Sequence, residues 1–194
     1  MSNRIITISR EFGSGGRTIG RETAKKLGIP CYDEEVIEKI AEESGLSKEY
    51  IKERGEYAPS ASWIGNALAG RDFNGASPAD ELFKLQSAII TELAGKSSCV
   101  IVGRCADYIL KNQADCLTVF IHASIEKRAE RIVKVYGERA EAPIKRLKDK
   151  DRRRKAYYQL YTDTEWGIAQ NYHIALDSGV LGIEKCVEII TALF

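Results

Sequence analysis

The chain of 194 residues is long enough to bury one substantial core and fits a single domain with room for a small insertion. Its 44% hydrophobic and 29% charged residues are an ordinary water-soluble composition, and a net charge of +1 gives no overall attraction to nucleic acid or acidic membranes. Since no apolar stretch approaches the length of a membrane span and no signal-peptide pattern precedes the first apolar run, we expect no membrane partner. From the small net charge, we also expect no nucleic acid as partner.

The five cysteines are odd in number, scattered along the chain, and form no C-x-x-C pair. Three of them lie inside apolar segments, so we expect reduced, mostly buried thiols in a cytoplasmic protein. The two histidines, His122 and His173, are far apart in the sequence and offer little for a zinc site.

Short apolar runs bounded by polar or turn residues alternate with helix-like segments. This alternation is typical of strands that are buried on both faces of a parallel sheet and joined by helices, so we predict an α/β fold. The predicted strands are 4–9, 30–32, 98–102, 117–122 and 172–177. The predicted helices are 18–27, 78 to about 94, 125–136, about 144–165, and 183 to about 193.

Capping residues support three of these helices. Gly28 is a suitable C-terminal cap for the first, Ser77 followed by Pro78 opens the second, and Ser124 caps the third. The pattern is weaker in the segment between the first two helices. There we predict two short helices, 34–44 and 48–54, followed by a loop over 55–75 that contains Gly, Ala and Ser.

The stretch ISREFGSGGRTIG, residues 8–20, follows the first strand and opens the first helix. Glycines between a strand and a helix commonly bring backbone N–H groups close to a negatively charged ligand. The phosphate-loop pattern G-x-x-x-x-G-K-[ST] is met at Gly16 and Thr18, but Glu11 stands at its first glycine and Arg17 at its lysine.

Three interpretations of this loop are open. It could be a tight bend without a ligand, or a dinucleotide-binding turn in which Gly13 and Gly15 fit G-x-G-x-x-G and Asp33 lies 20 residues beyond Gly13. We favour a modified phosphate loop in which Arg17 supplies the positive charge of the lysine and Thr18 coordinates Mg²⁺.

A second candidate site is Gly103-Arg104, which follows the strand 98–102 directly. Ligands of open α/β sheets bind at the carboxyl ends of the strands, so Arg104 is a candidate ligand-binding residue. The alternative is an arginine that merely follows a turn at the surface.

The third candidate is the basic stretch KRLKDKDRRRK, in which eight of eleven residues are Lys or Arg. Interleaved acids, such as Asp149 four residues before Arg153, favour a helix, and Asp151 and Arg154 lie on one face of it. A solvated helix face and a nucleic-acid patch are alternatives. We favour a lid over bound phosphates, because phosphoryl transfer needs positive charge around the transferred group.

The order of six segments resembles the cytidylate kinase-like family, relatives of bacterial cytidylate kinases among the P-loop nucleoside monophosphate kinases. The segments are ISREFGSGGRTIG, YDEEVIEKIAEESGLS, VIVGRCADYIL, VFIHASIEKRAERI, DRRRKAYY and YHIALDSGVLGIEKCVEII. The resemblance implies one P-loop kinase domain over 1–194, with a five-stranded parallel sheet flanked by helices. Within it, 34–80 would be a small NMP-binding insertion and 139–166 a helical lid.

The resemblance also implies the cofactors ATP and Mg²⁺ and a role for each matching residue. Asp33 would lie at the monophosphate site, Arg104 would contact the acceptor phosphate, Asp151 the acceptor nucleoside and Arg154 a phosphate. Arg17, Arg104 and Arg154 would be catalytic, and Thr18 would bind the metal. The residues that would hold the ATP phosphates are Gly13, Ser14, Gly15, Gly16, Arg17 and Thr18. Val102 and Cys105 stand where typical members have acids.

From these residues and this resemblance we predict ATP-dependent phosphorylation of a nucleoside monophosphate, with CMP or dCMP as the leading acceptor. Two other functions stay open at this point. One is a nucleotide-sensing module that binds ATP without turnover, and the other is a kinase of a different small-molecule acceptor.

Overall fold

The computed structural model describes residues 3–45, 47–49, 51, 56, 78–112, 115–162 and 164–194. All of the predicted loop over 55–75 except Glu56, and most of the predicted helix over 48–54, lie outside these residues. Within the described part of the chain, no helix is both long enough and apolar enough to cross a membrane.

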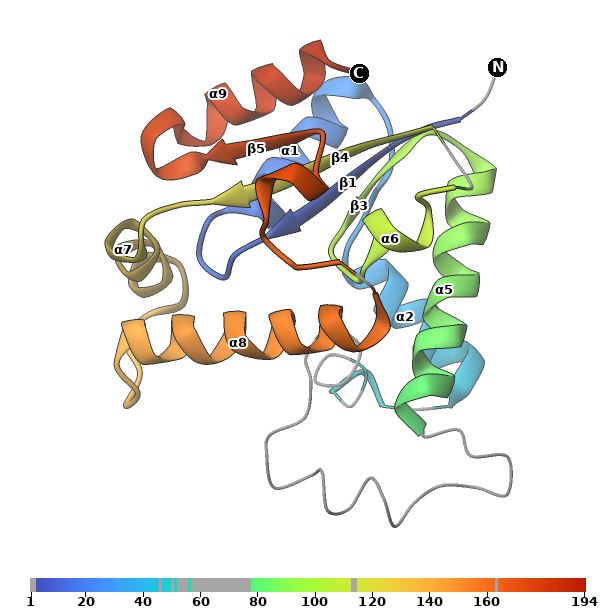
Figure 1. Ribbon diagram of the computed structural model, residues 1–194, viewed down its shortest axis with the longest axis horizontal. Helices are drawn as coiled ribbons and strands as arrows, with labels where there is room; N and C mark the ends of the chain where they lie inside the picture. The colour runs from blue at the N-terminus through green and yellow to red at the C-terminus, as the bar shows by residue number, and fades with distance from the viewer. Residues whose placement is uncertain are drawn as a thin grey trace.

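Five parallel strands form one sheet in the order β2-β3-β1-β4-β5, which confirms the predicted fold class (Figure 1). They are β1 (Arg4–Arg10), β2 (Cys31–Tyr32), β3 (Cys99–Val102), β4 (Asp115–His122) and β5 (Ile174–Asp177). All five strands occur where the apolar runs predicted them. β1 lies between β3 and β4, with Ile8 in register with Val102 on one side and Val119 on the other. The loop that follows β1 therefore opens at the centre of the carboxyl edge.

Alternating side chains of β1 face two separate apolar cores, because successive residues of a strand point to opposite faces. Ile6 and Ile8 pack with α1 (Gly16–Leu27) and α9 (Ser178–Ala192), whereas Ile5 packs with α2 (Glu34–Ser44) and α5 (Pro78–Lys96). Figure 1 shows α1 and α9 on one side of the sheet, and α2 and α5 on the other. The sheet is covered on both faces, as the continuous apolar strands predicted.

The described residues also include the α-helices α6 (Ala106–Ile109), α7 (Ile125–Tyr136) and α8 (Pro143–Tyr161) and a short 3-10 helix, Ala169–Asn171. The α7 helix has the predicted bounds, and the side chain of Ser124 caps it by accepting a hydrogen bond from Lys127 N. The short α6 helix was not predicted, and α8 ends at Tyr161 instead of 165 because Thr162 is extended. Tyr157 and Tyr158 of α8 pack into the core that contains α5.

The first turn of α9 also differs from the prediction of a helix starting at Ile183. The carboxylate of Asp177 caps an earlier start by accepting hydrogen bonds from Gly179 N and Val180 N. Gly182 then interrupts the helix with a φ of 77°, in a conformation that glycine adopts readily. The predicted start at Ile183 therefore corresponds to the segment after the interruption.

The contact between α1 and the sheet gives a stability test at Gly20. A Cβ atom at this position would come within 2.8 Å of Val102 Cγ2 and 3.3 Å of Ile8 Cδ1. Gly20→Ala should therefore lower the free energy of unfolding by ~1–3 kcal/mol, despite the better helix propensity of alanine. Urea denaturation measures this difference.

Gly95 is the matched control, since it also lies within a helix but has no heavy atom near the position of an added Cβ. Gly95→Ala should raise the free energy of unfolding by ~0.5–1 kcal/mol. Equal gains in both variants would contradict a close contact between α1 and β3.

Candidate active site

The glycine loop joins β1 to α1 in a conformation that requires glycine at two positions. Gly13 and Gly15 have φ values of +82° and +83°. A Cβ atom at Gly13 would lie 3.0 Å from the backbone oxygen of Arg128, and one at Gly15 would lie 2.6 Å from Ile183 Cδ1. The loop is therefore closely packed against α7 and α9, and it leads directly into the N-terminus of α1.

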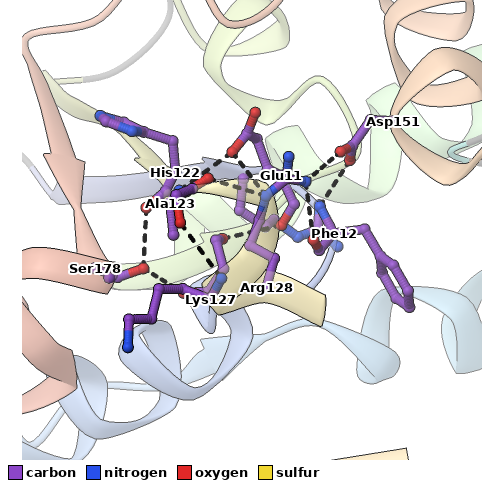
Figure 2. Close-up of polar contacts among 12 residues, drawn as sticks. Glu11, Phe12, His122, Ala123, Lys127, Arg128, Asp151 and Ser178 are labelled. Atoms are coloured by element: carbon purple, nitrogen blue, oxygen red, sulfur yellow. Dashed lines mark hydrogen bonds and ion pairs between the residues drawn. The ribbon is translucent and has the colours of Figure 1, made fainter. Parts of the chain in front are cut away.

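The side chain of Arg128 in α7 holds the loop from one side (Figure 2). Its Nε donates to the backbone oxygen of Ala123 at 3.0 Å and its Nη1 to that of Phe12 at 3.2 Å. The same guanidinium forms ion pairs with Glu11 and with Asp151. Arg128 is buried, and its contacts connect the loop, α7 and α8.

Asp151, predicted to face the acceptor nucleoside, lies against this loop. Its Oδ1 accepts a hydrogen bond from Phe12 N at 2.7 Å, and its Oδ2 pairs with Arg128. Glu11 accepts from Ala123 N at 3.2 Å, and burial raises the pKa of its carboxyl although Arg128 opposes that change. A further contact comes from α9, where the Ser178 hydroxyl lies 2.6 Å from the backbone oxygen of Ser14.

Arg17, in the first turn of α1, contacts Asp33, which follows β2, although β3 lies between β1 and β2 in the sheet. The Nε of Arg17 lies 2.6 Å from Asp33 Oδ2, and Arg21 contacts the same carboxylate at 3.5 Å. Burial raises the pKa of Asp33, and the positive charge of Arg17 acts against this effect. Arg17 is partly exposed, whereas Asp33 is buried.

Thr18 faces an arginine that the sequence analysis did not single out. Arg131 of α7 donates from Nη2 to the Thr18 hydroxyl at 3.0 Å. Arg128 and Arg131 are three residues apart on one face of α7, and that helical spacing was the available signal. Both arginines reach the loop from a helix that is more than a hundred residues away in the chain.

Three buried arginines surround one carboxylate where β1, β3 and α8 meet. Glu56 pairs with both terminal nitrogens of Arg10, and its Oε2 lies 3.5 Å from Arg154 Nη2. Arg154 also donates to the backbone oxygen of Arg10 at 3.3 Å. Burial alone would raise the pKa of Glu56, but Arg10, Arg154 and Arg104 outweigh it and lower the pKa. Neither Arg10 nor Glu56 was among the predicted site residues.

Arg104 reaches this cluster through an unusual turn. Gly103, Arg104 and Cys105 have φ values of 75°, 61° and 54°, a left-handed run that non-glycine residues adopt rarely. Arg104 donates from Nη1 to the backbone oxygen of Ile51 at 3.3 Å, and Gln86 donates to the Arg104 backbone oxygen at 3.2 Å. Such strain is held only where the surrounding structure enforces it, and it is often found at functional sites.

Val102 and Cys105, which flank Gly103-Arg104, stand where the family resemblance implies acids, and both are buried. Val102 is buried in the apolar core between the sheet and α1, where an unpaired carboxylate would be unfavourable. Cys105 is also buried, and burial raises the pKa of its thiol well above the ordinary value. This thiol is therefore not suited to act as a nucleophile.

Two small cavities adjoin the arginines. One, of about 120 Å³, lies beside the loop and is lined by Gly13, Gly16, Thr18, Arg131 and Tyr136, among others. The second, of about 20 Å³, is lined by Glu56, Gly103, Arg104 and Tyr157, among others. Arg10 and Arg154 line both cavities. A larger hollow of about 500 Å³ beside α6 contains none of the predicted site residues.

A glycine loop at a helix N-terminus on the carboxyl edge of a parallel sheet is the arrangement of P-loop kinases, and solved structures share this fold. An uncharacterized protein from Eubacterium ventriosum is similar, with a TM-score of 0.73 and 24% identity over 97% of this chain and 96% of that one. Shikimate kinase from Bacteroides thetaiotaomicron has a TM-score of 0.55 and 16% identity, covering 100% of this chain and 98% of that one.

Comparison with related sequences identifies the family of the chain within the P-loop kinases. Residues 5–180 match the model of the cytidylate kinase-like family, and the chain belongs to that family. A cytidylate kinase of Archaeoglobus fulgidus is 30% identical over 192 residues, covering 95% of this chain and 91% of the relative. A cytidylate kinase of Pyrobaculum calidifontis is 23% identical over 186 residues, covering 95% and 89%. The resemblance stated from the motifs is therefore confirmed, and family membership supports a phosphotransferase that uses ATP.

The arginine cluster gives a pH-dependent stability test. Because the pKa of Glu56 lies below its ordinary value of 4.5 in the folded protein, its stabilising contribution is complete above about pH 4.5 and is lost as the pH falls toward the folded pKa. Glu56→Gln should lower the free energy of unfolding by ~3 kcal/mol at pH 7, since three arginines lose their buried counter-ion. Urea denaturation between pH 7 and pH 3 should show a weaker pH dependence in this variant than in the wild type.

Glu188→Gln is the control, because the pKa of Glu188 is also lowered by a neighbour, Lys185, but this pair is exposed. It should leave both the stability and its pH dependence close to those of the wild type. The same acid-induced loss in wild type and Glu56→Gln would contradict the role given to Glu56.

Proposed function

We propose that the protein transfers the γ-phosphoryl group of ATP to a nucleoside monophosphate, with CMP and dCMP as preferred acceptors. The observation that carries the proposal is the meeting of Arg104 and Arg154, from the end of β3 and from α8, at the edge where the glycine loop opens. Phosphoryl transfer spreads negative charge over the transferred oxygens, and fixed guanidinium groups stabilise that charge.

In this proposal the loop holds the ATP phosphates. Backbone N–H groups from Gly13 to Thr18 lie at the start of α1, where the helix dipole also favours negative charge. Their placement is maintained by the contacts of Arg128, Asp151 and Ser178 with the loop. A preorganised loop of this kind stabilises phosphate charge without rearranging during the reaction.

Magnesium fits this site as an ion that enters with the nucleotide. Among the described residues, no group of three or more His, Cys, Asp or Glu side chains is placed to hold a metal. Mg²⁺ commonly keeps several waters and binds through substrate phosphates with few protein ligands. The Thr18 hydroxyl, which accepts from Arg131 in this structure, would be the protein ligand, and the ion would help to neutralise the phosphates.

The acceptor would occupy the side of the site formed by β2, β3 and α8. Arg104 and Arg154 would bind its phosphate, and Asp33 with Arg17 would border it at the end of β2. A nucleoside monophosphate has a second pKa near 6 and is mostly dianionic at neutral pH, so no general base is required. The segments 34–80 and 139–166 would serve as the NMP-binding insertion and the lid.

Asp151 would contribute indirectly in the conformation described here. Its carboxylate joins α8 to the loop through Phe12 and Arg128, so it couples the lid to the ATP site. A direct contact with the acceptor nucleoside, which the family resemblance implies, would require α8 to move relative to Phe12.

Steady-state assays with CMP, dCMP, UMP, AMP and GMP test the choice of acceptor. CMP or dCMP should give the highest kcat/KM, because a site that hydrogen-bonds one base leaves polar groups unpaired with another. Coupled detection of ADP release measures all five acceptors in one format. The cytidylate assignment fails if purine monophosphates react as efficiently as CMP, or if none of the five is phosphorylated.

Two arginines of α8 provide a matched test of the catalytic assignment. Arg154 is buried in the cluster. Arg152 is exposed and pairs with Asp149, three residues before it on α8. Arg154→Lys should lower kcat by about 100-fold, because lysine keeps the charge but cannot reproduce the planar fork. Arg152→Ala should change kcat by less than about threefold.

Thermal unfolding of both variants checks that they are folded before their rates are compared. Similar small losses of kcat in the two variants would mean that α8 contributes a solvated basic face and not a catalytic arginine.

A further inference from the structure

We propose that Arg10 contacts the transferred phosphoryl group, the role that the loop pattern assigns to Arg17. The inference rests on the proposed phosphotransfer function and names a residue that the sequence motif does not. Arg10 is the last residue of β1, immediately before the loop, and its side chain is buried. Four observations place it at the point of transfer.

The first observation is the position of Arg10 between the two cavities. It lines the cavity beside the glycine loop and also the cavity beside Gly103 and Arg104. The loop side would hold the ATP phosphates, and the Arg104 side would hold the acceptor phosphate. A group that passes from donor to acceptor crosses the boundary between them, and Arg10 and Arg154 both lie there.

The second observation is that two glycines leave room for the Arg10 side chain. A Cβ atom at Gly16 would lie 2.5 Å from Arg10 Cβ and 2.9 Å from its Cγ. A Cβ atom at Gly103 would collide with the guanidinium, at 2.7 Å from its Cζ. The arginine therefore runs between the first residue of α1 and the turn after β3, and any larger residue at either position would displace it.

The third observation is how the guanidinium group of Arg10 contacts its partner. Both terminal nitrogens of Arg10 contact the carboxylate of Glu56, one to each oxygen. This is the paired geometry that arginine uses for carboxylate and for phosphate oxygens alike. The Arg10 fork is thus already oriented to bind two oxygens of one anionic group, and Arg154 contacts the same carboxylate from α8.

The fourth observation concerns Arg17. Its Nε is 2.6 Å from Asp33, and its side chain is 43% exposed, compared with 7% for Arg10. A charge in a buried site is screened less and acts more strongly on a neighbouring phosphate than a partly exposed one. Arg17 also lines the cavity beside the loop, but its Nε contacts Asp33 after β2 and its side chain is more exposed, so Arg10 supplies the buried charge beside the loop.

The test compares the affinities of ATP and ADP, which differ by the γ-phosphate, in variants at the two positions. Isothermal titration calorimetry should show that Arg10→Ala and Arg10→Lys each reduce the ratio of ATP to ADP affinity by about tenfold or more. Arg17→Ala should change this ratio by less than about threefold. In kinetic assays, Arg10→Lys should lower kcat by about 100-fold, whereas Arg17→Ala should act mainly on the KM of the acceptor.

Gly16→Ala provides an independent route to the same result. Alanine is a better helix former than glycine, but here its Cβ would displace the Arg10 side chain. The ATP-to-ADP affinity ratio should fall in Gly16→Ala, and the substitution should add no further loss in an Arg10→Gly background, which also removes the Cβ atom of residue 10. Additive losses would mean that alanine disturbs the loop itself, and this would count against Arg10.

The outcomes separate this inference from the proposed function. An unchanged affinity ratio in folded Arg10→Lys, or an equal fall in Arg17→Ala, overturns the role of Arg10. A wild-type protein that binds ATP but phosphorylates no acceptor overturns the proposed transfer, while the affinity ratio still decides whether Arg10 contacts the γ-phosphate. A wild-type protein that binds neither nucleotide overturns both.

Discussion

Three buried guanidinium groups cannot share one small volume without an anion, and the architecture of the site follows from this constraint. Arg10, Arg104 and Arg154 come from the end of β1, the turn after β3 and the middle of α8. The carboxylate of Glu56 balances their charge, and the three arginines lower its pKa. Phosphate oxygens satisfy the same demand, so a site that must hold a carboxylate in this state is chemically suited to phosphates.

A second set of contacts connects the loop with α8. Arg128 contacts Glu11, the Phe12 backbone and Asp151, so the loop, α7 and α8 meet at this arginine (Figure 2). The ring of Phe12 stacks on Tyr136 at 6.1 Å, and the Arg154 guanidinium lies 5.8 Å from the Phe12 ring centroid. Phe12 therefore contacts both α7 and α8 from the loop.

Similarity to known proteins supports the fold of this chain more strongly than the identity of its acceptor. Solved structures of shikimate kinases share the fold at low identity, which says nothing about the acceptor of this chain. The relatives named cytidylate kinase that are compared above are 30% identical at most. Beside the arginine turn, Val102 and Cys105 are buried, and Glu56 balances the charge of the arginines.

The sequence by itself determined the strands, most helix bounds, the Ser124 cap and the glycine loop, because each depends on neighbours within one or two turns of the chain. It also predicted Arg104 at the carboxyl edge of the sheet, from the rule that strands of a parallel sheet end together, and proposed Arg154 from the basic helix that carries it. Only the tertiary structure decided which arginine accompanies them.

The pairing of Arg10 with Glu56 spans 46 residues, and that of Phe12 with Asp151 spans 139, so no local periodicity encodes either contact. Likewise, the sequence assigns Gly16 to the phosphate loop and Gly103 to the turn after β3, and only the fold brings the Arg10 side chain between them. Charge and steric complementarity between distant segments exist only after the sheet has assembled, and for that physical reason the candidate phosphoryl-contacting residue could not be found from the motif.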